Sequence, residues 1–450
     1  MTIIAFLSFL VFSTYFSPLT INRMNLLLLM FITFIFNSSY TLFSINDGMS
    51  IYNDWFFINN SNLYFINIML MTVMLLLTYN SFYKSNNMYF SLIMLANTLG
   101  LMLFPLINDM LSLYILIELQ SYSLYMLTGI NNKSFNSSRA ALLYFLMGGM
   151  ASCLMLLASY FIYESLGTTN LSEIWTLSYY IDMSLFNYML MMALLFKMGL
   201  APLHRWSMAV YNYAPTYMTA YMSMVAKMSM MSFMFTWTNN LDLSIMYMFF
   251  MSSLVMGAYK PLYQVNIKTM LAYSGLLNFS YLLLSMIINS EMSSIGFYLY
   301  LSQYVMTHML MFLMMLTASY YMTSPMSEWS PLTFMHQLNF PNKALSGCLM
   351  MALFSLMGLP PTPGFYAKLL MFTSALSANY MFESLLMMFF SVMATYYYAN
   401  MMKMLMKNPV ATMNNMSPVL AYMMSYMSML LLFMFVYLDT LLQGTYLFMM

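Results

Sequence analysis

The stretch at positions 196–204 reads Phe-Lys-Met-Gly-Leu-Ala-Pro-Leu-His and lies within a long apolar run. Positions 358–368 have the same character, since Gly-Leu-Pro-Pro-Thr-Pro-Gly is followed by Phe-Tyr-Ala-Lys. Gly and Pro free backbone groups that hydrocarbon cannot satisfy, so a membrane helix is broken only where protein or a wet cavity surrounds it. Such breaks in two halves of a chain are typical of inverted repeats that line a transport path. The two stretches therefore predict discontinuous membrane helices.

The composition assigns the chain to the polytopic membrane proteins. Of its 450 residues, 62% are hydrophobic and only 6% are charged, whereas a soluble domain carries about 25% charge. The net charge of +1 gives no indication of nucleic-acid binding. The two cysteines form no C-x-x-C or Cys/His cluster, and no phosphate loop, nucleophile triad or dinucleotide fingerprint occurs. We therefore expect no metal, cofactor or redox site in this chain.

The apolar runs predict an all-α fold of about fourteen transmembrane helices, because a spanning helix needs roughly 20 apolar residues. The seventh and twelfth segments contain the two breaks. The expected segments are 2–16, 24–43, 64–82, 88–106, 110–127, 140–163, 186–203, 215–237, 243–258, 270–288, 295–322, 344–370, 382–402 and 419–438.

The spacing of the breaks predicts the domain organisation. The breaks stand five segments apart, in the seventh and the twelfth, which fits two inverted five-helix repeats. We expect one membrane domain with three helices in 1–86, a first repeat in 87–240, a second in 241–405 and a final helix in 406–450. The expected break residues are Gly199, Pro202, Gly358, Pro360, Pro361, Pro363 and Gly364.

Loop charges segregate by connection and predict the orientation. The odd-numbered connections hold basic residues such as Arg23, Lys84 and Lys133, the even-numbered ones hold acidic residues, and only Glu328 breaks the rule. Because basic loops stay on the cytoplasmic or matrix side, both termini are expected on the less basic side. In an inner mitochondrial membrane this is the intermembrane-space side. The 64 methionines serve either as apolar filler or reflect an organelle code that reads an extra codon as Met.

Four charged residues lie inside the predicted segments, where a charge costs about 2.5–3.5 kcal/mol on insertion scales. They are Glu118, Lys197, Lys227 and Lys368. Snorkelling or a structural ion pair would be the simplest explanation, but a chain of buried titratable residues is also how pumps relay protons. Burial and a partner charge act on a lysine proton in opposite directions. A Glu118–Lys197 pair could therefore release a proton toward Lys227 when the glutamate moves away.

Three further residues are candidates for a secondary proton path. Lys268 stands at a segment start, where snorkelling to the interface is the favoured interpretation. His308 lies within the eleventh segment, and a neutral buried histidine is the alternative to a relay group. His204 follows the first break and either caps a broken helix end or shapes a proton entrance.

Several motifs together resemble the antiporter-like subunits of respiratory complex I. They are Leu-Ile-Glu-Leu-Gln-Ser-Tyr at 116–122, the stretch 196–204, Ala-Pro-Thr-x-x-Thr-Ala at 214–220, Ile-Lys-Thr-Met-Leu-Ala-Tyr-Ser at 267–274 and the stretch 358–368. The resemblance implies proton translocation coupled to NADH:ubiquinone oxidoreduction in other subunits. It also implies that the residues of the proton relay are Glu118, Lys197, Lys227 and Lys368. One departure is Asn278, which stands where many relatives have a histidine.

The resemblance also implies the surroundings of the chain. Neighbouring antiporter-like and small membrane-arm subunits and lipids are the expected partners, in the mitochondrial inner membrane. NADH, FMN, iron–sulfur clusters and ubiquinone would belong to partner subunits. Two rival hypotheses remain: a cation/proton antiporter subunit of related fold, and a structural membrane scaffold whose buried charges only fix helix packing.

Overall fold

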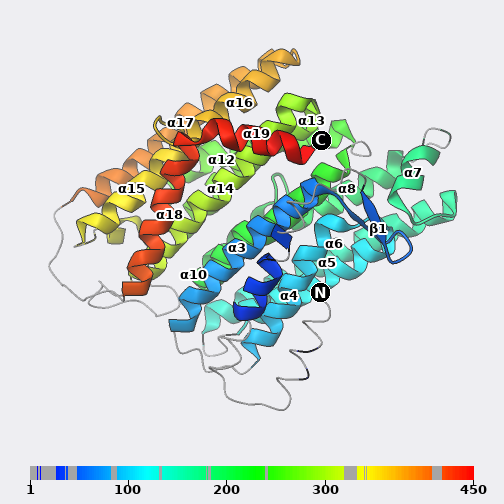
Figure 1. Ribbon diagram of the computed structural model, residues 1–450, viewed down its shortest axis with the longest axis horizontal. Coiled ribbons are helices and arrows are strands. Elements are labelled where there is room, and N and C mark those ends of the chain that lie inside the picture. Colours follow the sequence, from blue (N-terminus) through cyan, green and yellow to red (C-terminus); the bar gives the residue numbers. More distant parts are fainter. Residues whose placement is uncertain are drawn as a thin grey trace. The chain divides into compact units, whose positions relative to one another are not determined.

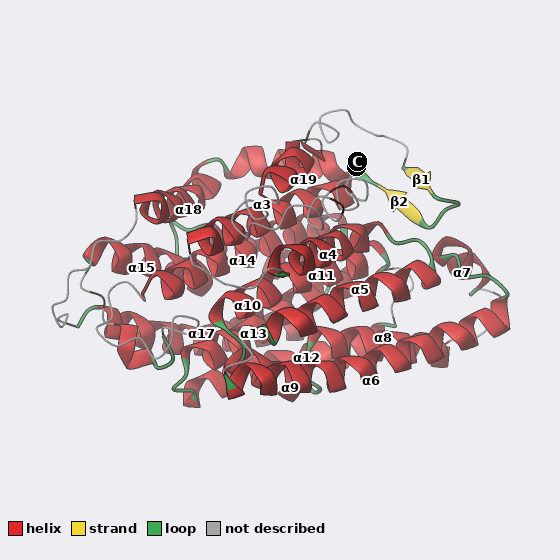
Figure 2. Ribbon diagram, turned by 90° about the horizontal axis from the view of Figure 1, so that it is seen from below, coloured by secondary structure: helices red, strands yellow, loops and turns green. Residues whose placement is uncertain are grey.

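The computed structural model is almost entirely helical (Figures 1 and 2). It describes residues 8, 11, 27–35, 37–38, 48–82, 89–130, 134–178, 180, 184–238, 242–318, 332–338, 340, 342–407 and 418–449. The expected first segment, 2–16, lies outside these ranges apart from two positions, and so do Arg23, Lys84, Lys133 and Glu328.

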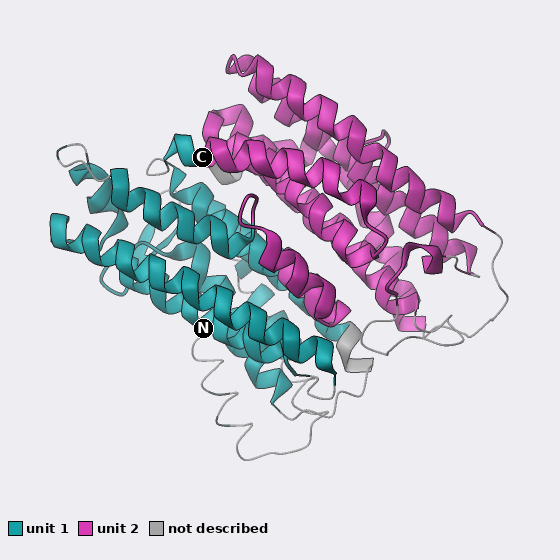
Figure 3. Ribbon diagram, turned by 180° about the vertical axis from the view of Figure 1, so that it is seen from behind, with its two compact units in different colours: residues 1–199, 225–245, 448–450 teal, residues 200–224, 246–447 magenta. Residues whose placement is uncertain are grey.

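The chain divides into two compact units (Figure 3). Unit 1 comprises Met1–Gly199, Val225–Ile245 and Phe448–Met450, and unit 2 comprises Leu200–Met224 and Met246–Leu447. In unit 1, α5 packs between α4 and α6, and α6 packs on α8. The elements of unit 1 are β1 (Met49–Ile51), β2 (Phe56–Ile58), α3 (Asn60–Phe82), α4 (Phe90–Leu103), the 3₁₀ turn η1 (Phe104–Leu106), α5 (Met110–Thr128), α6 (Phe135–Leu166), α7 (Leu171–Leu177), α8 (Ser184–Met198) and α11 (Lys227–Thr236).

Unit 2 is built around the long helix α14, which is buried along its spanning length and packs on α10, α13, α15, α16 and α18. The elements centred in unit 2 are α9 (Arg205–Tyr213), α10 (Thr216–Tyr221), α12 (Leu243–Tyr259), η4 (Lys260–Tyr263), α13 (Ile267–Ile288), α14 (Glu291–Thr317), η6 (Met335–Leu338), α15 (Lys343–Met357), α16 (Pro363–Ser377), α17 (Met381–Leu405), α18 (Pro418–Val436) and α19 (Leu438–Met449). The π-helical turn η2 (Met222–Ala226) connects α10 to α11.

Helix ends follow the local sequence. Asp109 caps α5 by accepting a hydrogen bond from the backbone N–H of Leu111 at 2.7 Å, as a carboxylate at an N-cap does. Ser290 and Ser293 form a reciprocal capping box at the start of α14. α15 ends at Gly358, whose φ of 80° favours glycine. These caps fix where the apolar runs enter and leave the bundle.

The described segments from 64–82 onward match helices or pairs of helices. In the described part, eight helices are long and apolar enough to cross a membrane. α8 and α15 have 15 residues each and are therefore only about 22 Å long. Each is followed by a break and then by a second helix, so the seventh and twelfth segments are discontinuous. Composition did not predict the β1–β2 hairpin, the short helix α7 or the terminal helix α19.

Candidate functional site

Glu118 and Lys197 come together in unit 1, one from α5 and the other from α8. Lys197 Nζ lies 3.9 Å from Glu118 Oε1, and the two side chains are 5% and 15% exposed, respectively. Within the described ranges neither of these two atoms makes a hydrogen bond. The contact is therefore a buried charge pair rather than a hydrogen-bonded salt bridge. Either side chain can move without breaking a hydrogen bond to Lys197 Nζ or Glu118 Oε1 in the described part of the chain.

The first helix break explains why Lys197 lies where it does. α8 ends at Met198, one residue after the lysine, and Gly199 turns the chain with φ 68°. The carbonyl groups at a helix C-terminus favour a positive charge. Pro202 lies in the connection to α9, and the break thus leaves a lysine at the open carbonyl end of α8.

A polar cluster beside Glu118 was not predicted from the sequence. Asn97 of α4 donates hydrogen bonds to the Gln120 carbonyl at 2.9 Å and to Ser123 Oγ at 2.7 Å. Gln120 is 1% exposed, and its side-chain amide has no hydrogen-bond partner in the described part of the chain. A buried amide in this state is a natural site for ordered water. In the sequence, Gln120 was recognisable only as a polar residue two positions after Glu118.

Lys227 is buried, with 4% exposure, and is the first residue of α11 in unit 1. The π-helical turn Met222–Ala226 directly precedes it. Single π turns within helices occur frequently at functional sites, because they offset the helix and free backbone groups. The sequence identified the lysine by its depth in an apolar run, but the π turn gave no sequence signal.

Lys368 of α16 reaches back across the second break in unit 2. It is 7% exposed, and its Nζ donates hydrogen bonds to the carbonyls of Leu356 and Met357 at 2.9 and 2.8 Å. These carbonyls belong to the last turn of α15, so the lysine caps that helix.

Two glycines shape the second break. A Cβ at Gly358 would lie 2.9 Å from Lys368 Cδ, and a Cβ at Gly364 would collide with the carbonyl of Ser355. Pro363 is the first residue of α16, where its missing N–H costs nothing. Pro360 and Pro361 occupy the connection between α15 and α16. The Gly-Pro motif therefore brings the end of α15 and the start of α16 into close contact.

The secondary candidates lie in unit 2. Lys268 is 5% exposed, and its Nζ donates to the Ala214 carbonyl at the end of α9 at 2.8 Å, so the prediction that it snorkels to the interface is wrong. His204 precedes α9 and is 3% exposed. Its Nδ1 lies 3.2 Å from the Pro202 carbonyl, and its ring packs edge-on against Tyr273. His204 and Lys268 thus stand at opposite ends of α9.

His308 is buried within α14, with 1% exposure. Its ring centroid lies 4.1 Å from that of Tyr304. Asn278 of α13 accepts a hydrogen bond from the Tyr300 hydroxyl at 2.9 Å, and both residues are buried. Within the described ranges, no group of three His, Cys, Asp or Glu side chains could hold a metal ion.

The chain is similar to known membrane subunits over most of its length. Residues 107–395 match the family described as NADH:quinone oxidoreductase/Mrp antiporter, transmembrane. The NADH-ubiquinone oxidoreductase chain 2 of Debaryomyces hansenii is 51% identical over 100% of both chains. That of Candida albicans is 42% identical over 95% of this chain and 90% of the relative.

Solved structures share the fold at low identity. A chain of respiratory complex I from Thermus thermophilus has a TM-score of 0.84 and 21% identity, covering 98% of this chain and 99% of the other. A chain of the Mrp complex from Dietzia has a TM-score of 0.87 and 15% identity, covering 99% and 95%. At these identities the similarity shows the fold alone.

Proposed function

The chain belongs to the NADH:quinone oxidoreductase/Mrp antiporter family as an antiporter-like subunit of the complex I type, and from this membership we propose how protons cross it. The observation that carries the proposal is the buried Glu118–Lys197 pair, 3.9 Å apart, at a helix break. The proposed relay consists of Glu118, Lys197, Lys227 and Lys368.

Magnitudes support an electrostatic switch at this pair. Two unit charges about 4 Å apart interact by about 4 kcal/mol at an effective dielectric constant of 20. Moving one charge against 100 mV costs about 2.3 kcal/mol. Displacing or neutralising Glu118 therefore changes the free energy of the proton on Lys197 by about 4 kcal/mol. This exceeds the roughly 2.3 kcal/mol that is needed to move one charge against 100 mV. No large helix motion is needed.

The remaining titratable groups take the next steps in this scheme. Lys227 receives the proton that Lys197 releases and passes it toward Lys368. Lys268, His308 and His204 form a secondary path, and at Asn278, where no titrating histidine is available, water or Lys268 carries the proton. The second break keeps two backbone carbonyls next to Lys368 Nζ, whereas the ammonium of Lys197 faces the Glu118 carboxylate; in this scheme each set of oxygens holds the protonated lysine until the relay moves.

We further propose the setting of this subunit. Fourteen transmembrane helices, with two inverted five-helix repeats, would lie in the mitochondrial inner membrane with both termini on the intermembrane-space side. The chain would act as a subunit of a proton-translocating NADH:ubiquinone reductase. Other membrane-arm subunits and lipids are its partners, and NADH, FMN, iron–sulfur clusters and ubiquinone are held by other subunits.

The test is proton pumping alongside NADH oxidation in vesicles that carry the assembled complex with Lys227→Met. We expect both activities to fall by at least tenfold with normal assembly. The matched control is Lys403→Met, because Lys403 is an exposed lysine of α17, and it should leave both activities unchanged. Normal pumping in Lys227→Met would favour the scaffold hypothesis instead.

A cation/proton antiporter is the second candidate, because the fold matches an Mrp subunit with a TM-score of 0.87. It predicts that a sodium gradient alone drives proton movement in vesicles that contain the complex. Under the leading proposal, a sodium gradient without NADH drives none, and substrate oxidation is required.

A further inference from the structure

A carboxylate that moves away from Lys197 inside the membrane needs another polar partner. Glu118 Oε1 lies 3.9 Å from Lys197 Nζ and makes no hydrogen bond in the described part of the chain. A charge that loses its partner in a buried position carries the full cost of desolvation, unless a hydrogen-bond donor takes the partner's place. The donors around Glu118 therefore determine which second position the carboxylate can occupy.

The titratable side chains around Glu118 come from α5 and α6 of unit 1, apart from the lysine on α8. Tyr114, Tyr122 and Tyr125 of α5 lie within electrostatic range of the carboxylate. Tyr114 and Tyr122 stand four positions before and after Glu118, and residues at this spacing are neighbours on one face of a helix. Cys153 of α6 lies beside these two tyrosines, but a thiol is only a weak donor. Three phenolic hydroxyls are therefore the candidate donors.

The Tyr125 hydroxyl is kept from this role by its packing. Tyr125 is 8% exposed, and its ring packs edge-on against Tyr144 of α6, with ring centroids 4.8 Å apart. Its hydroxyl occupies the space that a Cβ would fill at Gly148 of α6, so the side chain is wedged between the two helices. Turning this ring toward Glu118 would open a gap in a close helix contact, which protein interiors tolerate poorly. Tyr125 therefore joins α5 to α6 and does not follow the carboxylate.

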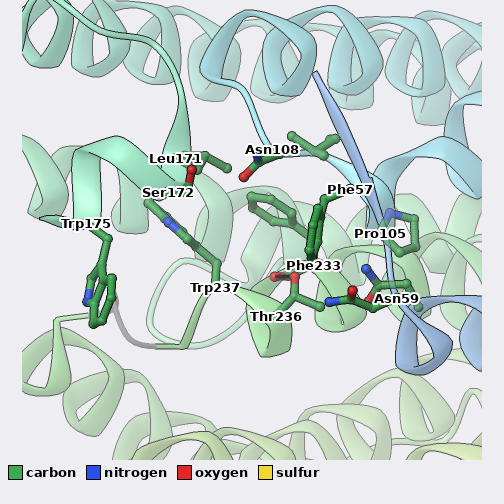
Figure 4. A pocket seen from close by; sticks show the side chains of 12 residues that line it. Phe57, Asn59, Pro105, Asn108, Leu171, Ser172, Trp175, Phe233, Thr236 and Trp237 are labelled. Atoms are coloured by element: carbon green, nitrogen blue, oxygen red, sulfur yellow. Dashed lines mark hydrogen bonds between the residues drawn. The ribbon is translucent and has the colours of Figure 1, made fainter. Parts of the chain in front are cut away.

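A cavity in unit 1 is out of reach of the carboxylate (Figure 4). It has a volume of about 230 Å³, and its walls come from the start of α3, the turn η1, the start of α7 and the end of α11. None of its lining residues is charged, and none belongs to α5, α6 or α8. Glu118 stands about 12 Å along α5 from the first residue of that helix, Met110. The second position of the carboxylate must therefore be sought on α5 itself.

Tyr122 has both the position and the freedom to receive the carboxylate. Its hydroxyl lies within hydrogen-bond reach of Glu118, whereas Tyr114 interacts with Glu118 only through charge. Tyr122 packs edge-on against Tyr125, with ring centroids 6.0 Å apart, so the wedged Tyr125 orients it. The Tyr122 side chain is 56% exposed, whereas Lys197 is 5% exposed. Glu118 thus stands between an outer hydroxyl and an inner ammonium.

We propose that Tyr122 is a positioning residue whose hydroxyl receives the Glu118 carboxylate when the carboxylate leaves Lys197. This inference rests on the proposed relay and adds one residue to its first step. In the first position, the carboxylate faces the ammonium across 3.9 Å. In the second, the phenolic O–H donates a charge-assisted hydrogen bond to the carboxylate, and the ammonium is left without its counter-charge. The phenol keeps its own proton, so the only proton that leaves is that of Lys197.

The test compares Tyr122→Phe with Tyr114→Phe in vesicles that carry the assembled complex. Tyr122→Phe removes the hydroxyl and keeps the ring that contacts Tyr125. Without its second partner the carboxylate stays beside Lys197, and we expect proton pumping during NADH oxidation to fall about 10-fold, the low end of the effect of one hydrogen bond to a charged group. Tyr114→Phe is the matched control, because it removes a hydroxyl at the same spacing that interacts with Glu118 only through charge, and it should change nothing.

An infrared measurement on the same complexes separates this role from a structural one. The carboxylate band of Glu118 is identified by its loss in Glu118→Gln. It should shift in Tyr122→Phe and stay in place in Tyr114→Phe, because the stretching frequency of a carboxylate changes with the hydrogen bonds that it accepts. Tyr122→Met should give the same shift and the same loss of pumping, so the result does not depend on the assembly of a single variant.

Normal pumping in Tyr122→Phe, an equal defect in Tyr114→Phe, or a Glu118 band that stays in place would each overturn the inference. A failure of the underlying relay would appear elsewhere, as normal pumping in Lys227→Met. Pumping can therefore be normal in Tyr122→Phe and still be lost in Lys227→Met, and this combination would reject the role of Tyr122 while the proposed relay stands.

Discussion

The two helix breaks place a lysine at the carbonyl end of a helix in different ways. At the first break, Lys197 precedes the break and faces the Glu118 carboxylate at 3.9 Å. At the second, Lys368 follows the break and donates two backbone hydrogen bonds, at 2.9 and 2.8 Å, to the end of α15. One lysine depends on a side chain that can move or take up a proton. The other depends on carbonyls that cannot leave without unwinding a helix.

This difference distinguishes two kinds of proton site. We call Lys197 a switch, because the energy of its proton depends on a movable side chain, and Lys368 a fixed station, because the energy of its proton depends on backbone carbonyls. The Glu118 carboxylate can move away or take up a proton, and either change alone alters the energy of a proton on Lys197. Lys368 has no comparable partner among the contacts that the structure describes, so its environment changes only if the break itself moves. We therefore expect the first break to control when protons move and the second to fix where they arrive.

The largest effect should come from Gly364→Ala, which breaks the second site sterically. The new methyl group would collide with the Ser355 carbonyl, a backbone atom that cannot turn away. Because a backbone atom must shift, we expect a loss of stability above the roughly 1–3 kcal/mol that overpacking usually costs, and almost no assembled complex on a native gel. Gly347→Ala is the control in α15, because a Cβ there meets nothing within 4 Å. Normal assembly of Gly364→Ala would show that the close contact between α15 and α16 is not required.

Breaking the first site electrostatically should have the next largest effect. Glu118→Ala leaves Lys197 buried without its counter-charge, which costs about 3–5 kcal/mol. The double variant Glu118→Ala, Lys197→Met removes both charges and should recover most of the thermal stability of the complex. Proton pumping should stay absent in both. Equal stability of all variants would mean that water already screens the pair.

Lys368→Met tests the fixed character of the second lysine. It removes a charged donor from two α15 carbonyls, and the expected loss is about 1.5–3 kcal/mol. Lys368→Gln keeps a neutral donor and should restore part of the heat stability but no proton pumping. If Lys368→Gln pumped normally, the lysine would be a helix cap and not a relay group.

The sequence predicted the features that depend on residues close together along the chain. Apolar runs gave the helices, Gly and Pro gave the breaks, and depth within a run identified Lys227 as buried. A pair such as Glu118 and Lys197 was foreseeable because only a few charges lie inside the predicted segments. Membership of the complex I type was predicted from the spacing of the motifs and is confirmed by the 51% identity to a chain 2 relative.

Contacts between distant segments were not predictable in this way. Lys268 was assigned to the interface because it opens a segment, but its acceptor is the Ala214 carbonyl, 54 positions away. The amide of Gln120 and the acceptors of Lys368 are likewise set by packing and by the path of the chain through a break. The short helix α7 and the terminal helix α19 are too short or too polar for a span-based prediction.

The smallest effect concerns the hydrogen bonds between Gln303 and Ser355 beside the second break. Gln303 Nε2 of α14 donates to Ser355 Oγ at 3.0 Å and to the Ser355 carbonyl at 3.3 Å. Ser355→Ala removes one neutral hydrogen bond and should cost about 0.5–1.5 kcal/mol, a small drop in the unfolding midpoint of the complex with pumping retained. Ser346→Ala is the control, because that hydroxyl bonds only within α15 among the contacts described, to the Lys343 carbonyl at 2.8 Å. A pumping defect in Ser355→Ala alone would mean that the second break also moves during turnover, and the distinction between a switch and a fixed station would no longer hold.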